Sequence, residues 1–98
     1  MHELKFEWDE RKNRMNRRKH GVSFEEAQTT FFDEDAIEFY DPDHSEREER
    51  FLLLGRSFKL RILIVCHCYR KAEDVIRIIS TRRATRREQL LYIRRENI

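Results

Sequence analysis

The sequence has little of what interrupts regular structure, since its 98 residues include one proline and two glycines. That scarcity excludes a collagen-like chain and a glycine-rich linker between domains. Long apolar runs are also absent: the longest, residues 62–66, falls far short of the ~20 residues that a membrane-spanning helix needs. We therefore expect a single domain over residues 1–98, located in the cytoplasm and with no membrane contact.

Cysteine is scarce as well, with only Cys66 and Cys68. Because one residue separates them inside a strand-like run, a disulfide between them is disfavoured and reduced core thiols are predicted. The four histidines are scattered along the chain. Residues 41–49, around His44, carry enough carboxylates to suggest a metal site, but their spacing matches no metal motif. An exposed turn is the preferred interpretation, and we expect no metal and no other cofactor.

Charge, by contrast, is abundant and segregated, although 21 Lys and Arg nearly balance 19 Asp and Glu. Residues 9–20 hold six basic and two acidic side chains, and residues 77–95 hold seven Arg and one Glu. Residues 33–50 are the opposite, with nine acidic and two basic side chains. Such blocks predict two cationic surfaces and one anionic segment, although solvated faces of a hydrophilic domain would explain them equally well.

Apolar side chains alternate with polar ones in five short segments, which is typical of strands. These predicted strands are a short leading one at residues 5–8 and four more at residues 36–40, 50–56, 61–69 and 75–81. The four later strands are joined by short polar connections, which favour an antiparallel meander.

Three helices are predicted from their caps. Asp9 is a good N-cap for a helix that ends near His20 before Gly21, with Met15 as its main interior apolar residue. Capping boxes at residues 23–26 and 85–88 begin the second and third helices. The second helix carries an apolar face that is expected to pack on the sheet, and the third carries several aliphatic side chains. These are Phe24, Ala27, Phe31 and Phe32 in the second, and Leu90, Leu91 and Ile93 in the third. The order β-α-α-β-β-β-β-α indicates an α+β fold with helices over one face of the sheet.

Alternation along the strands suggests where chemistry could lie. If the fully apolar faces are under the helices, a set of polar side chains would gather on the open face: Glu38, Tyr40, Arg50, His67 and Arg77. These residue types suffice to cleave RNA without a metal. A base removes the proton of the 2′-hydroxyl, an acid protonates the leaving 5′-oxygen, and a cation binds the phosphate. His67 could be acid or base, with Glu38 or Glu48 as its complement. Purely structural roles for the histidine and arginines remain the alternative.

Several motifs resemble, in order and spacing, the BrnT family of bacterial toxins. They run from about residue 6 to residue 92 and comprise FEWD (6–9), KHGVSFEEA (19–27), His44 and Ser45 with Glu48 and Arg50, GRS (55–57), RIIS (77–80) and RAT (83–85). The resemblance implies a RelE-like fold and a ribonuclease activity that inhibits translation. It also implies a BrnA-like antitoxin that neutralises the toxin in a complex of two toxins and two antitoxins, and that binds operator DNA.

With that resemblance, the sequence predicts a metal-independent endoribonuclease toxin. Arg50 and Arg77 are expected to contact the reacting phosphate, with His67 and Glu48 as proton-transfer candidates. Four further side chains are predicted to bind the RNA: Lys19, His20, Arg56 and Arg83. Two alternatives stay open, a non-catalytic module that binds RNA or DNA and a domain that binds only another protein.

Overall fold

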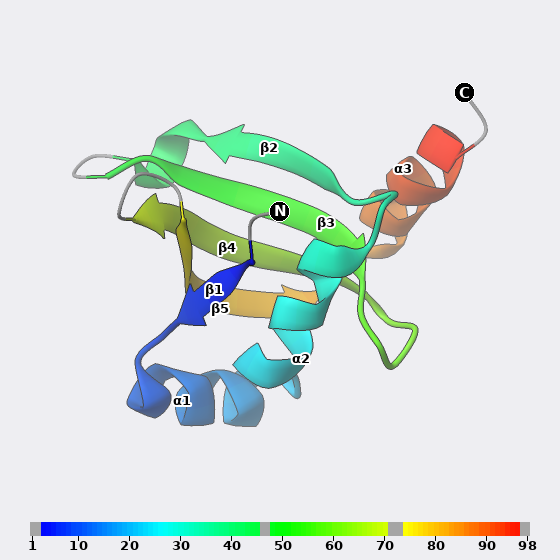
Figure 1. The fold of residues 1–98 in the computed structure, drawn as a ribbon. Helices are drawn as coiled ribbons and strands as arrows, with labels where there is room; N and C mark the ends of the chain where they lie inside the picture. Colours follow the sequence, from blue (N-terminus) through cyan, green and yellow to red (C-terminus); the bar gives the residue numbers. More distant parts are fainter. Residues whose placement is uncertain (1–2, 46–47, 71–73, 97–98) are drawn as a thin grey trace.

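The computed structural model describes residues 3–45, 48–70 and 74–96, and its elements follow the predicted order (Figure 1). The strands are β1 (Lys5–Glu7), β2 (Ile37–Asp41), β3 (Arg50–Arg56), β4 (Ile62–Arg70) and β5 (Val75–Arg83). The helices are α1 (Glu10–His20), α2 (Phe24–Thr29) and α3 (Arg86–Glu96), with 3₁₀ turns η1 (Thr30–Phe32) and η2 (Pro42–His44). The predicted α+β class is confirmed.

The strands form one sheet in the order β1-β5-β4-β3-β2. The predicted antiparallel meander from β2 to β5 is confirmed, and β1 joins its far edge in parallel to β5. A β-bulge interrupts the pairing of β4 with β5 beside Cys66 and His67. Because a bulge adds one residue to one strand, it changes which side chains of that strand share a face.

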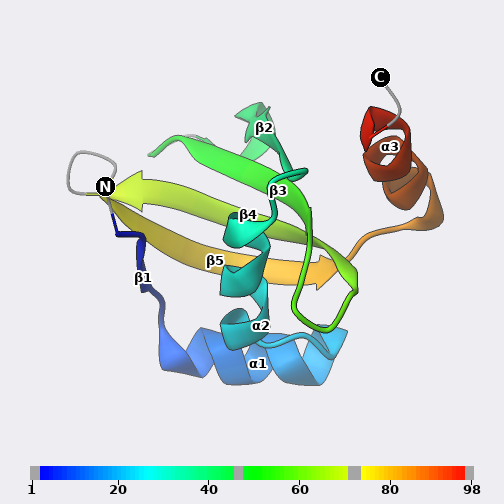
Figure 2. The ribbon, with the colours of Figure 1, turned by 45° about the vertical axis from the view of Figure 1, so that its right-hand side comes forward.

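The sheet has two unlike faces. Helices α1 and α2 lie together against one of them, which we call the covered face, whereas α3 lies at the other end of the sheet (Figures 1 and 2). The covered face contributes Leu53, Val65 and Ile78 to a core with Phe24. Leu54 and Ile64 alternate with those residues and pack instead against Tyr92 of α3. The prediction that all helices cover one face is therefore wrong, and α3 covers only part of the opposite face, which we call the open face.

Helix α1 is attached through polar side chains, and the prediction that Met15 is its interior residue is wrong. Met15 is 60% exposed, whereas Asn13 and Asn16 are buried. The Asn16 amide donates to the backbone oxygens of Val22 and Thr81, each at 2.8 Å, and its oxygen accepts from the Thr81 N–H at 3.1 Å. Strand β1 pairs only with Val75–Arg77, so it offers no partners to the backbone groups of β5 beyond Arg77. Asn16 supplies hydrogen-bond partners to the N–H and carbonyl groups of Thr81 there.

The helix starts differ in how completely their caps form. In α3 the predicted capping box closes in both directions, with Glu88 N–H donating to Thr85 and Thr85 N–H donating to Glu88. Hydrogen bonds from Arg82 also lower the pKa of Glu88 to about 2. In α2 only half of the box forms, because the Glu26 carboxylate turns away from Ser23 and pairs with Arg61. Glu26 thereby ties α2 to Arg61, the residue that precedes β4.

Helix α2 is shorter than the apolar pattern predicts. It ends at Thr29, and residues 30–32 form the 3₁₀ turn η1. The Thr29 and Thr30 hydroxyls donate to backbone oxygens of the preceding turn, which offers the chain an alternative to continued α-helix. As a result Phe31 packs against the core while Phe32 is 66% exposed, so the expected packing of Phe32 on the sheet is wrong.

Candidate functional site

The five side chains expected together on the open face are divided between the two faces. Residues paired across a sheet share a face, and His67 pairs with Phe51 and Ile78 on the covered face. Glu38 reaches His67 from β2 on that same face. Arg50 and Arg77 lie on the open face, since Arg50 precedes Phe51 and Arg77 pairs with Cys68. The predicted gathering is wrong. Alternation divides the side chains of each strand between two faces, but it does not show which of those faces lies under the helices.

His67 is a buried, fully bonded side chain. Its Nδ1 lies 2.9 Å from the Val65 carbonyl oxygen, and its Nε2 lies 3.0 Å from the Glu38 carboxylate, which also accepts from the Tyr69 hydroxyl. Because a carbonyl oxygen only accepts hydrogen bonds, Nδ1 is the donor in the bond to Val65. The rings of Phe31 and Phe51 pack around it. This environment holds the imidazole in place within the sheet.

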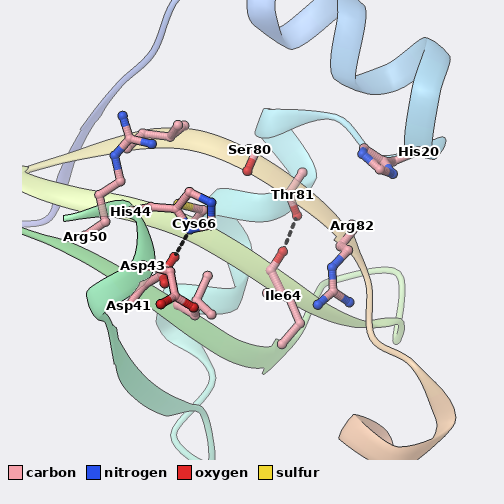
Figure 3. A pocket seen from close by; sticks show the side chains of 12 residues that line it. His20, Asp41, Asp43, His44, Arg50, Ile64, Cys66, Ser80, Thr81 and Arg82 are labelled. Carbon is pink, nitrogen blue, oxygen red and sulfur yellow. Dashed lines mark hydrogen bonds and ion pairs between the residues drawn. The ribbon is translucent and has the colours of Figure 1, made fainter. Parts of the chain in front are cut away.

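The open face carries a cavity of about 420 Å³ beyond the part that α3 covers. It extends from the β2–β3 connection across β4 to β5 and the end of α1. Its lining residues are His20, Asp41, Asp43, His44, Arg50, Leu52, Ile64, Cys66, Ile79, Ser80, Thr81 and Arg82. Figure 3 shows Arg50 and His44 at one end and His20 and Arg82 at the other. Cationic or ionisable side chains therefore lie at both ends of an elongated cavity.

Arg50 lines this cavity and has a buried donor that no described residue uses. Its Nε is buried and has no hydrogen-bond partner among the described residues. One terminal nitrogen of its guanidinium lies 4.0 Å from the Glu48 carboxylate, at the limit of an ion pair. The side chain is 32% exposed, so a ligand in the cavity can reach it. A guanidinium with free donors suits a phosphate, which accepts two parallel hydrogen bonds.

Glu48 and Arg77 lie beyond Arg50 on the same open face. Burial raises the pKa of the Cys68 thiol, and the adjacent Glu48 carboxylate raises it further, which places Glu48 over β4. Arg77 donates to Glu7 of β1 at 2.9 Å, and Arg70 approaches the same carboxylate at 3.7 Å. The structure thus brings together three of the four predicted catalytic residues, with His67 on the other face.

The four predicted RNA-binding residues lie in separate places. His20 lines the cavity, and Lys19 is exposed beside it in the last turn of α1. Arg56 lies over the Tyr92 ring, 5.5 Å from its centre, near the exposed Phe32. Arg83 is exposed at the end of β5. Only the pair at the end of α1 adjoins the open-face cavity.

Two features of the cavity escaped the sequence reasoning. One is an ion pair between Asp41 and His44, in a turn for which the sequence predicts only exposure. The other is Ser80, which alternation places opposite Arg77. The bulge in β5 pairs Ser80 with Cys66 and so brings it to the open face.

In residues 3–45, 48–70 and 74–96, no three metal-ligating side chains lie close enough to hold an ion.

Comparisons with known proteins agree with the fold and the motifs. Residues 8–88 match a family model described as the ribonuclease toxin BrnT of type II toxin–antitoxin systems. The crystal structure of the Brucella abortus ribonuclease toxin BrnT is similar, with a TM-score of 0.64 and 24% sequence identity. The similarity covers 86% of this chain and 100% of that one, and at this identity it concerns the fold. No curated protein sequence matches the chain.

Proposed function

This chain belongs to the BrnT family of ribonuclease toxins of type II toxin–antitoxin systems, and we propose that it cleaves RNA in the open-face cavity without a metal ion. One observation carries the choice of this site. The buried Nε of Arg50 lacks a partner among the described side chains and borders a cavity open to solvent. A buried unpaired donor costs free energy, and a catalytic role or a bound ion is one of the reasons for which native proteins retain such a group.

Arg50 would bind the reacting phosphate, and its charge would stabilise the additional negative charge of the pentavalent transition state. Arg77 is held by Glu7, its partner in β1, and pairs with Cys68 of β4 on its other side. We assign it to a phosphate that flanks the cleaved bond. Glu48 lies close enough to Arg50 to orient the guanidinium. Lys19 and His20 would hold the RNA backbone where it leaves the cavity.

Other predicted roles need a different placement of the RNA. Arg56 and Arg83 would contact the strand only if it continued past α3, outside the cavity. A catalytic role for His67 would need RNA to approach the covered face and the Glu38 contact to open. We propose instead that His67 holds β2 to β4, and that its effect on cleavage is indirect.

Cleavage is expected to proceed in EDTA, because the 2′-hydroxyl of RNA supplies the nucleophile and side chains supply proton transfer and charge. The measurement is incubation of purified protein with RNA in EDTA and, in parallel, in magnesium. Similar rates in both would support metal independence. Intact RNA in EDTA with cleavage restored by magnesium would contradict it. Raising the salt concentration should weaken RNA binding in either buffer, through counterion release.

A type II system pairs its toxin with an antitoxin protein, and we propose the details of that pairing here. A BrnA-like antitoxin would cover Lys19, Arg50 and Arg77 with an acidic segment, in a complex of two toxins and two antitoxins that binds operator DNA through the antitoxin. Desolvated arginine–carboxylate pairs would give the contact its specificity. Coexpression with the neighbouring gene product should yield a complex without ribonuclease activity. A complex that cuts RNA as fast as the free protein would refute this placement of the antitoxin.

We also propose that the protein acts in the cytoplasm, where its RNA substrate is. Among the residues that the structure describes, no helix is long and apolar enough to cross a membrane.

A further inference from the structure

Asp41 and His44 form a pair at the end of the cavity where Arg50 lies (Figure 3). Asp41 is the last residue of β2 and is buried, and its Oδ2 lies 2.9 Å from Nδ1 of His44. The His44 side chain is 67% exposed. The carboxylate is therefore largely buried, and the exposed imidazole that it bonds lines the cavity together with it.

The turn that carries the pair is fixed at both ends. Pro42 begins the 3₁₀ turn η2, where its ring sets the backbone angle. Ser45 closes the turn: its hydroxyl donates to the Asp41 carbonyl oxygen and accepts from the Arg50 N–H. These bonds tie the turn to the first residue of β3. The Ser45 hydroxyl thus links the backbone of Asp41, which begins the turn, to that of Arg50.

The pairing also decides which nitrogen of the ring can accept a proton. An ionised carboxylate only accepts hydrogen bonds, so Nδ1 of His44 carries the proton that it donates to Asp41. In the neutral ring Nε2 then has a free lone pair, and no described residue bonds to it. A histidine oriented in this way by a carboxylate, beside a cation that fits a phosphate, has the properties of a general base.

We propose that His44 is the general base of RNA cleavage and that Asp41 positions it; this inference rests on the proposed function. Nε2 of His44 takes the proton of the 2′-hydroxyl, and the 2′-oxygen forms a bond to the phosphorus held by Arg50. The bond from phosphorus to the 5′-oxygen breaks, and that oxygen takes a proton from water. The products are a 2′,3′-cyclic phosphate and a 5′-hydroxyl, and the imidazolium returns its proton to solvent. Asp41 stabilises the imidazolium while it exists.

The alternatives for this role are placed less well. His67 has both ring nitrogens bonded on the covered face. Glu48 is engaged by the Arg50 guanidinium and by the Cys68 thiol. His20 lines the cavity at the end opposite Arg50 in Figure 3, without a described carboxylate partner.

The test is single-turnover cleavage in EDTA by the wild type, His44→Ala, Asp41→Asn and the double variant, with Glu49→Gln as an exposed control from the same acidic segment. His44→Ala should slow cleavage by roughly 10²–10⁴-fold, and free imidazole should restore part of the rate. Asp41→Asn should lower the maximal single-turnover rate and leave unchanged the protein concentration that gives half of that rate. The double variant should be no slower than His44→Ala, because Asp41 acts only through His44. Glu49→Gln should match the wild type.

Each contrary outcome has a distinct meaning. Wild-type cleavage by His44→Ala, with the wild type active, would overturn the base assignment and leave the proposed ribonuclease function intact. If the rate losses of the two substitutions multiply in the double variant, Asp41 does not act through His44, and its positioning role is overturned. An RNA with sulfur in place of the leaving 5′-oxygen needs no acid, so His44→Ala should remain slow on it. Restoration of the rate on that substrate would make His44 the acid. If the wild-type protein never cuts RNA, the proposed function itself is contradicted.

Discussion

Replacing Arg50 by methionine is expected to slow RNA cleavage by about 10²–10³-fold, the usual cost of removing one group that stabilises charge in a transition state. Methionine keeps much of the length of the side chain and removes its charge and donors. The free energy of unfolding is expected to stay the same or to rise. In the absence of RNA the Nε of Arg50 is a buried donor without a described partner, which costs about 1–3 kcal/mol.

Two further variants separate charge from geometry. Arg50→Lys keeps the charge but loses the planar fork, so its cleavage rate should lie between those of the wild type and Arg50→Met. Arg94→Met removes an exposed arginine of α3 and should leave the rate unchanged. Cleavage rates and urea unfolding are measured for all three. An Arg50→Met protein that cuts RNA at the wild-type rate would show that the phosphate does not bind at this cavity.

Replacing Asn16 by leucine is expected to lower the free energy of unfolding by about 3 kcal/mol or more. Leucine is of similar size but cannot form the three bonds that Asn16 makes to Val22 and Thr81. Three buried backbone groups would lose their partners, and each such loss costs about 1–3 kcal/mol. Helix α1 has no buried apolar residue that could hold it to the sheet instead.

Met15→Ala is the matched control, since Met15 is the exposed neighbour of Asn16 in the same helix. It should change the unfolding free energy by less than about 0.5 kcal/mol, as surface substitutions usually do. Asn16→Asp keeps the acceptor for the Thr81 N–H but places a charge against two carbonyl oxygens, so it should also destabilise strongly. Equal stability of Asn16→Leu and the wild type would mean that α1 is held in another way.

Local patterns in the sequence predicted most of the elements. Alternation identified β3 with its observed bounds and the other strands within two residues. The Asp9 cap and Gly21, whose φ is +69°, bound α1 where expected. These signals succeed because caps and strand alternation depend on neighbouring residues alone. The motifs that resemble the BrnT family also lay in the sequence itself, and the family assignment is confirmed.

What depends on contacts between distant segments was not predictable in this way. Nothing in the polar run of α1 distinguishes Asn16, which faces β5, from the exposed residues beside it. The bulge that turns Ser80 to the open face breaks the alternation from which the faces were inferred. Alternation along β3 and β5 predicts that Arg50 and Arg77 share a face, as they do. His67 lies on the other face because both faces of β4 carry apolar side chains, and the face with Ile64 packs against α3.

The most direct test of the account is the chemical identity of the ends that the purified protein leaves on RNA digested in EDTA. Attack by the 2′-hydroxyl at the open-face cavity predicts 2′,3′-cyclic phosphate and 5′-hydroxyl ends. It also predicts no cleavage at a position where the attacking nucleotide carries 2′-deoxyribose. Ends with a 5′-phosphate, or cleavage at the deoxy position, would contradict the account, because water would then be the nucleophile.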